Sequence, residues 1–202
     1  MRIIAGQFKG RRLAAIKGLE VRPTSDRVKA AAFSILGARV VDADFLDLCA
    51  GTGNIGLEAL SRGAKSATFI ERNHHCIRII ESNLEQCGLN RKGPQVRLIK
   101  REARQGLADL GKRKAQFHLI YFDPPYDAEI YEACVEQIAR ERLLSPDGLL
   151  VVEHRFRLPT SQRLRKSETE PPLPLKVGEL ILSRQEQYGD TVLSFYQWEE
   201  TS

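Results

Sequence analysis

The residues best suited to chemistry gather around a short apolar run and the two glycines that follow it. Asp47 lies near the end of the run 45–48, which predicts a buried strand, and Gly51 and Gly53 follow shortly after it. Glycines let the backbone turn sharply and let a ligand approach without a Cβ in the way. A helical pattern follows, so free N–H groups and the positive end of a helix dipole would point into the same space. This arrangement suits a cofactor that carries both a cationic amino group and an anionic carboxylate.

A second acid narrows the choice of cofactor. The dinucleotide fingerprint is a glycine pattern followed by an acid that hydrogen-bonds a ribose diol. It is matched by Gly51-x-Gly53-x-x-Gly56, with Glu71 about 20 residues after Gly51. NAD, FAD and S-adenosylmethionine all offer such a ribose. Asp47 would repel a pyrophosphate but suits a methionine ammonium group, which favours S-adenosylmethionine. The alternative is that Asp47 is a simple strand-end acid.

The motif Asp123-Pro124-Pro125-Tyr126 follows another apolar run, 117–122, at the strand end where open α/β sheets bind ligands. The Asp123 carboxylate and the Pro124 carbonyl could accept the two hydrogens of an exocyclic amine. This would localise the nitrogen lone pair toward a methyl donor. Tyr126 offers a ring on which a base can stack. The structural alternative is a Pro-Pro turn with a packed tyrosine.

Further positions adjoin these motifs. Glu102 follows a third expected strand and could accept a hydrogen bond from the adenine amine of a cofactor. The alternative, that Glu102 is a solvated surface charge in a basic loop, is nearly as good an interpretation. We also expect Asn54, Arg72 and Ala103 to contribute to the cofactor site. The four histidines have no ligand spacing and the four cysteines form no C-x-x-C pair, so we expect no metal site and reduced thiols in a cytoplasmic protein.

The elements that must position these residues alternate along the chain. Strands are expected at 45–48, 67–71, 96–99, 117–122 and 149–153, with helices between them. This order predicts a mostly parallel sheet covered on both faces. Two late strands at 179–183 and 191–198 should pair antiparallel, and the first 16 residues predict a basic β-hairpin.

Charge is unevenly distributed over the 202 residues. Residues 1–39 carry nine Lys/Arg and two acids in a chain whose net charge is +5, and 91–114 carry another nine Lys/Arg and two acids. Two such clusters indicate a polyanionic partner, and the alternative is a pair of solvated faces. No apolar run approaches the roughly 18 residues of a membrane span.

Several segments together resemble a known family, the RsmD-type bacterial 16S rRNA guanine-N2 methyltransferases. The segments that carry the resemblance are 1–6, Arg22-Pro23-Thr24, 56–64 and 188–191, together with Asp47-x-x-x-Gly51-x-Gly53 and the Asp123 motif. The resemblance implies an α/β, Rossmann-like fold with a seven-stranded, mostly parallel sheet and an antiparallel last strand. It further implies an N-terminal arm at 1–20 before a methyltransferase domain at 21–202.

The resemblance also assigns roles. Asp47, Gly51, Gly53 and Glu71 would bind S-adenosylmethionine, and Asp123 to Tyr126 would hold a guanine of 16S rRNA within an assembling small ribosomal subunit. The protein would act as a monomer. RNA phosphates would be bound by basic and polar residues of the N-terminal segment, namely Arg11, Arg12, Arg22, Thr24 and Arg27.

The chain departs from the family pattern in the helix after Arg27. The family usually has a Glu where this chain reads Lys29-Ala30-Ala31-Ala32, and Asn is common where Ser34 stands. If that Glu helps hold the cofactor or the 22–27 loop, the protein would bind more weakly or have a shifted target.

Alternatives remain open from the residues alone. The same chemistry could serve adenine-N6 methylation of DNA or methylation of a protein glutamine. An NAD(P)-dependent oxidoreductase is disfavoured by Asp47. A non-catalytic RNA-binding assembly factor is disfavoured by the intact Asp123 motif.

Overall fold

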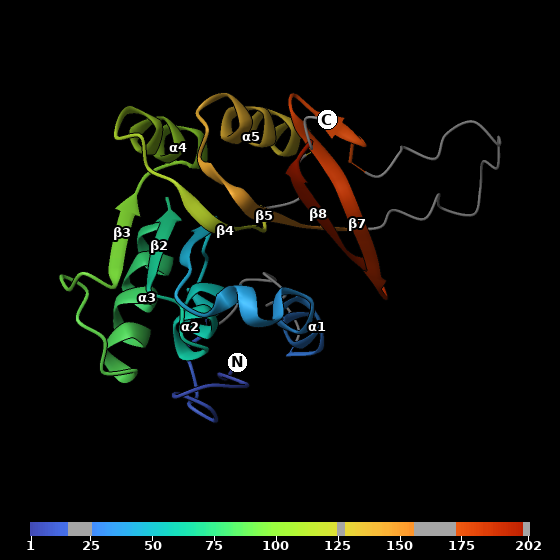
Figure 1. Cartoon of the computed structure of the whole chain (residues 1–202). Coiled ribbons are helices and arrows are strands. Elements are labelled where there is room, and N and C mark those ends of the chain that lie inside the picture. The colour runs from blue at the N-terminus through green and yellow to red at the C-terminus, as the bar shows by residue number, and fades with distance from the viewer. Residues whose placement is uncertain (16–25, 125–127, 156–172, 200–202) are drawn as a thin grey trace, which may run out of the picture.

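One eight-stranded sheet organises the protein (Figure 1). The computed structural model describes residues 1–15, 26–124, 128–155 and 173–199. The strands are β1 (Asp44–Leu48), β2 (Ser66–Glu71), β3 (Val96–Lys100), β4 (Phe117–Phe122), β5 (Leu144–Arg155), β6 (Lys176–Val177), β7 (Leu180–Tyr188) and β8 (Thr191–Trp198). Their order across the sheet is β3-β2-β1-β4-β5-β8-β7-β6. The first five strands run parallel, and β8 pairs antiparallel with β5 and β7.

Helices cover both faces of this sheet. On one face lie α1 (Asp26–Leu36), α2 (Asn54–Ser61) and α3 (His74–Gln86), and on the other lie α4 (Ala103–Lys112) and α5 (Ala128–Arg140) (Figure 1). A short 3-10 helix (Gly37–Val40) follows α1. Each face has its own apolar core, because central strands such as β1 bury side chains on both sides. No helix in the described ranges is long and apolar enough to span a membrane.

The predicted fold class is confirmed, with one correction to the strand count. Seven strands were expected in the sheet, and the structure has eight because the two-residue β6 pairs with β7. Two residues give no period-2 pattern, so the sequence carries no signal for this strand. The late hairpin is also longer than expected, since β7 continues to Tyr188.

The turn after β1 has the conformation that its glycines permit. Gly51 and Gly53 have φ values of +55° and +75°, in the left-handed region. Gly56, inside α2, is required for packing, because a Cβ there would lie 2.3 Å from the Phe69 ring of β2. The helix therefore sits directly against the sheet, and its first turn is fixed beside the end of β1.

The N-terminal residues form a hairpin that belongs to the main core. Arg2 and Arg12 make an antiparallel bridge, and the Ile3 N–H donates to the Arg11 carbonyl at 2.9 Å. Ile3 and Leu13 are buried in a cluster with α2, α3 and β2. The expected boundary at residue 20 lies outside the described residues, so that division stays a prediction.

Candidate active site

The acids singled out in the sequence gather at the carboxyl edge of the sheet. Asp47 lies near the end of β1 and Glu71 ends β2, while Asp123 directly follows β4. The Asp123 N–H donates to the Leu48 carbonyl at 3.4 Å, which places its backbone beside the end of β1. This is the edge where open α/β sheets bind ligands.

The glycine turn forms an open cradle at this edge. The Gly53 N–H donates to the Ala50 carbonyl at 2.7 Å, and the Ala50 N–H donates to the Ile70 carbonyl of β2 at 3.0 Å. Among the described residues, and apart from Gly51 and its two chain neighbours, no atom lies within 4 Å of the place where a Cβ on Gly51 would stand. A ligand can therefore approach the backbone there, at the N-terminus of α2.

Asp47 lies beneath the turn and is almost fully buried. Its Oδ2 accepts from the Gly56 N–H of α2 at 2.8 Å. Burial raises the pKa of Asp47 to about 8, helped by the nearby Glu71 charge and opposed by the Gly56 hydrogen bond. The carboxyl is therefore mainly neutral at pH 7, and a cationic ligand group would favour its ionisation.

Glu71 fixes the backbone on both sides of the site. Its two carboxylate oxygens accept from the N–H groups of Gly51 and Asn73, each at 2.8 Å. A carboxylate offers about four acceptor positions, so it can still accept from a ribose hydroxyl. The neighbouring Arg72 is exposed at the same edge.

Glu102 has a local role that the sequence interpretation did not include. It is the N-cap of α4, where Oε2 accepts from the N–H groups of Arg104 and Gln105 at 3.1 and 3.3 Å. Its position one residue before a helix was the available signal. Ala103, the first residue of α4, is buried beside it.

The structure describes only the first half of the Asp123 motif. Asp123 is half-buried and Pro124 is buried at the end of β4, whereas Pro125 and Tyr126 lie outside the described residues. Phe122 of β4 pairs with Val152 of β5 in the parallel register. Asp123 and Glu153 are the next residues along these two neighbouring strands.

Glu153 is an acid at this edge that the sequence interpretation passed over. It is 7% exposed, and its Oε2 accepts from the Tyr121 hydroxyl at 2.6 Å. Burial, together with the Glu153 and Asp123 charges, raises the pKa of Tyr121, which therefore stays protonated as a donor. An acid that closes a buried apolar run is the same signal that singled out Glu71.

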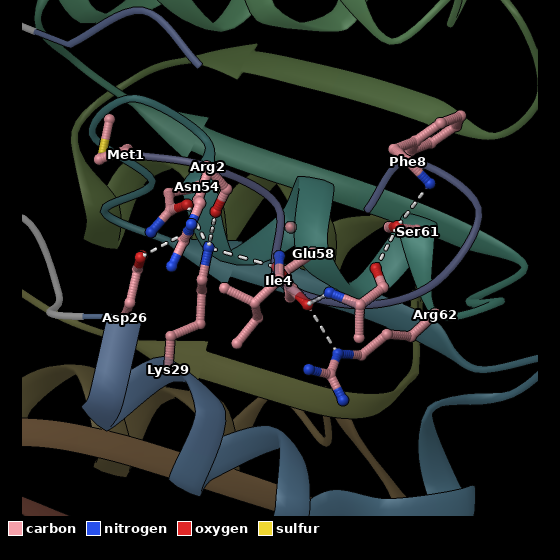
Figure 2. Close-up of polar contacts among 12 residues, drawn as sticks. Met1, Arg2, Ile4, Phe8, Asp26, Lys29, Asn54, Glu58, Ser61 and Arg62 are labelled. Atoms are coloured by element: carbon pink, nitrogen blue, oxygen red, sulfur yellow. Dashed lines mark hydrogen bonds and ion pairs between the residues drawn. The ribbon is translucent and has the colours of Figure 1, made fainter. Parts of the chain in front are cut away.

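Asn54 contributes its side chain to a buried network rather than to the cradle. Its Oδ1 accepts from the Lys29 Nζ at 2.7 Å. Lys29 also donates to the Arg2 carbonyl at 2.6 Å and lies 3.2 Å from the Glu58 carboxylate (Figure 2). Burial lowers the pKa of Lys29, and the Glu58 charge opposes that shift. Nothing in the local sequence indicated this network.

The stretch of α1 that departs from the family pattern includes Lys29, which belongs to that network. Ala30 and Ser34 are exposed, whereas the intervening Ala32 and Phe33 are buried.

Three of the basic residues proposed to contact RNA are described, and all three are exposed. Arg11 and Arg12 lie on the hairpin, and Arg27 lies in the first turn of α1. The Arg11 guanidinium lies over the Phe8 ring and donates to the Gln86 carbonyl of α3. Arg22 and Thr24 fall outside the described residues.

The sheet order, the glycine turn and the acids at its carboxyl edge define a Rossmann-like methyltransferase. Comparison with known proteins agrees with this class. The family model described as "Conserved hypothetical protein 95" matches residues 1–197, and the chain belongs to this family.

Individual relatives cover almost the whole chain. The putative rRNA methyltransferase YlbH of Bacillus subtilis is 34% identical over 98% of each protein. Ribosomal RNA small subunit methyltransferase D of Escherichia coli is 32% identical over 98% of this chain and 90% of its own length. The structure of the putative methyltransferase yhhF from Escherichia coli superposes with a TM-score of 0.79 at 31% identity, covering 98% of each chain. The resemblance to the RsmD-type family is thereby confirmed.

Proposed function

We propose that the protein transfers a methyl group from S-adenosylmethionine to the exocyclic N2 amine of a guanine in 16S rRNA. The observation that carries this proposal is the position of Asp123 and Pro124 at the end of β4, beside the glycine turn after β1. This position would bring two acceptors for an amine next to the proposed site of the methyl donor. The names of the relatives, which are rRNA methyltransferases, support an RNA substrate.

The residues at the sheet edge fit S-adenosylmethionine. The open space at Gly51 admits a ligand to the backbone, and the neutral carboxyl of Asp47 can ionise against an ammonium group. Glu71 would accept from the ribose, with Arg72, Glu102 and Ala103 around the adenine and Gly53 completing the turn. Asn54 would support this site indirectly, because its side chain holds Lys29. The bound cofactor would supply an electrophilic methyl group.

Asp123 and Pro124 would activate the guanine amine. An aromatic amine is a poor nucleophile because its lone pair is delocalised into the ring. Two acceptors that draw its hydrogens out of the ring plane localise the lone pair on nitrogen. This interaction strengthens as the nitrogen becomes tetrahedral, so it lowers the barrier rather than only improving binding. The proton released on methylation would pass to the Asp123 carboxylate or to water.

The remaining motif and the basic residues would capture the RNA. Tyr126, next to Pro125, would stack on the flipped guanine, since base–aromatic stacking contributes about 1–3 kcal/mol. Arg11, Arg12, Arg22, Thr24 and Arg27 would contact phosphates. The substrate would be 16S rRNA within an assembling small subunit, and the protein would act as a monomer in the cytoplasm.

One experiment tests the reaction and its target together. Small-subunit RNA from cells with and without the gene is digested to nucleosides and fragments, and N2-methylguanosine is located by mass spectrometry. We expect one guanine of 16S rRNA to lose its N2 methyl group without the gene. Purified enzyme and labelled cofactor should restore that methyl group in subunits from the deletion cells. An unchanged 16S modification pattern, or label in DNA or a protein glutamine instead, would contradict the proposal.

A further inference from the structure

The cofactor turn and the N-terminal hairpin are joined by two buried polar side chains that no catalytic step uses. Lys29 of α1 and Asn83 of α3 are both 0% exposed. They approach the turn from different helices, and each contacts both the hairpin backbone and a residue in the turn or directly after it. Together they connect the proposed RNA-binding surface to the proposed cofactor site.

Lys29 makes the first connection. Its Nζ donates to the Arg2 carbonyl in the first arm of the hairpin at 2.6 Å and to Oδ1 of Asn54 at 2.7 Å (Figure 2). Asn54 directly follows Gly53, so this bond holds the exit of the turn. The Glu58 carboxylate, 3.2 Å away, balances the ammonium charge. One buried cation therefore links three segments that are distant in sequence.

Asn83 makes the second connection. Its Oδ1 accepts from the Ala14 N–H at 2.7 Å, and its Nδ2 donates to the Ala14 carbonyl at 3.3 Å and to the Thr52 carbonyl at 3.0 Å. Ala14 lies in the second arm of the hairpin, and Thr52 lies between the two turn glycines. In addition, the Thr52 hydroxyl lies 3.5 Å from the Met1 sulfur. Both arms of the hairpin are thus tied to the turn.

We propose that Lys29 and Asn83 are positioning residues that couple RNA binding at the hairpin to cofactor binding at the turn. The proposal rests on the proposed function. RNA bound to Arg11 and Arg12 holds the docked hairpin more firmly against α2 and α3, and Lys29 and Asn83 transmit that restraint to Asn54 and Thr52. The cofactor then binds a turn that is already held in place, so each ligand tightens the other.

The test is a thermodynamic cycle with S-adenosylhomocysteine, the reaction product, as a probe that cannot react. Its Kd is measured by calorimetry with and without saturating small ribosomal subunits from cells that lack the gene. For the wild type we expect at least about fivefold tighter binding with subunits, the lower end of typical coupling between sites. Lys29→Met and Asn83→Leu should each reduce that ratio toward one.

A matched control separates this connection from hairpin docking in general. The Ser61 Oγ accepts from the Phe8 N–H at 2.9 Å and donates to the Ala5 carbonyl at 2.5 Å, and neither of these hydrogen bonds involves the turn. Ser61→Ala should loosen the hairpin yet keep the ratio. If Lys29→Met does not fold, Asn54→Ala removes only the bond from Lys29 to the turn and leaves Lys29 bound to Arg2 and Glu58.

The outcomes separate this inference from the proposed function. A wild-type ratio of one, with subunits bound and methylated, overturns the coupling and leaves the function intact. A ratio that survives in Lys29→Met, Asn54→Ala and Asn83→Leu also overturns it, as does an equal loss in Ser61→Ala. Failure of the wild type to bind or methylate subunits would instead contradict the proposed function, on which the coupling depends. Hydrogen exchange at residues 50–57 should slow on subunit binding in the wild type and should slow less in Asn83→Leu.

Discussion

The ammonium of Lys29 lies 3.2 Å from the carboxylate of Glu58, and both side chains are 0% exposed. Glu58 also accepts from the Ile4 and Ala5 N–H groups at 2.9 and 3.0 Å and from the Arg62 Nε at 2.8 Å (Figure 2). The carboxylate therefore has several donors, whereas Lys29 has Glu58 as its balancing charge. Replacing Glu58 and replacing Lys29 should therefore lower the free energy of unfolding by different amounts.

We expect Glu58→Ala to lower the free energy of unfolding by about 3–5 kcal/mol, because it leaves a buried cation without its counter-charge. Lys29→Met should cost less, since Glu58 keeps three donors. Urea unfolding measures both variants. The exposed pair Lys176–Glu199 is the control, and Glu199→Gln should change stability by less than about 1 kcal/mol. Equal costs for Glu58→Ala and Lys29→Met would contradict this asymmetry.

Two glycines of the hairpin offer a matched pair of variants. Gly6 and Gly10 have φ values of +82° and +83°. A Cβ on Gly6 would lie 1.8 Å from the Ser61 carbonyl oxygen, whereas at Gly10 no atom of the described residues, its two chain neighbours apart, lies within 4 Å. Gly10→Ala should cost about 1–2 kcal/mol from backbone strain alone. Gly6→Ala should cost clearly more, because the hairpin must also move off α2. Thermal unfolding of both variants measures the difference, and equal shifts in Tm would show that the hairpin is not docked as described.

These contacts show which features the sequence could and could not predict. The Asn73 cap of α3 depends on neighbours in sequence, because the N–H groups that it accepts from, those of His75 and Cys76, are two and three residues away. The glycine turn and the acids at strand ends were predictable for the same reason, since each depends on a local pattern. Glu58 joins α2 to the hairpin more than 50 residues earlier in the chain. No periodicity in the sequence indicates such a contact, although the 56–64 segment that contains Glu58 is one of those that carry the family resemblance.

The raised pKa of Asp47 predicts pH-dependent cofactor binding. With a pKa of about 8, the carboxyl holds a proton at pH 7 that it must release to pair with an ammonium group. Affinity for S-adenosylmethionine should therefore rise almost tenfold per pH unit up to about pH 8 and then level off. Calorimetry should also detect about one proton released per cofactor at pH 7. Asp47→Asn should bind more weakly with little pH dependence, and a flat wild-type profile between pH 6 and 8 would remove this assignment.

The raised pKa of Asp47 also makes the stability of the folded protein depend on pH. The unfolded carboxyl has a pKa of about 3.9, so between that value and about 8 the folded state binds the proton more tightly. Asp47 therefore contributes stability that is full below about pH 4 and is lost as the pH rises through about 8. Asp47→Asn should flatten this part of the stability profile of the protein without cofactor.

The exposed arginines of the hairpin predict a salt dependence. Each phosphate contact releases counterions, so the Arg11→Ala/Arg12→Ala double variant should reduce the log–log salt slope of RNA binding by roughly 1.4 to 1.8. Arg184→Ala on β7 is the control, because Arg184 is exposed and paired with Glu186. Filter binding to small subunits at several salt concentrations measures the slopes. The same slope in wild type and double variant would mean that these arginines form a solvated face.

Asp123 allows catalysis to be separated from binding. Its proposed interaction with the guanine amine strengthens in the transition state, so its loss should appear in the chemical step. Asp123→Ala should bind cofactor and RNA nearly as the wild type does and lose roughly a hundredfold or more in single-turnover rate. Asp123→Asn keeps an acceptor oxygen and should lose less.

Tyr126 provides the comparison for Asp123, because its proposed role is to bind the base rather than to activate the amine. Tyr126→Ala should weaken capture of the flipped guanine by about 1–3 kcal/mol, whereas Tyr126→Phe keeps the stacking face and most of the activity. Single-turnover methyl transfer over a range of enzyme concentrations separates the two effects. Saturating enzyme should restore the rate of Tyr126→Ala far more than that of Asp123→Ala, since only the former defect is in binding. A near-wild-type rate in Asp123→Ala would remove Asp123 from the chemistry and leave the motif as a structural turn.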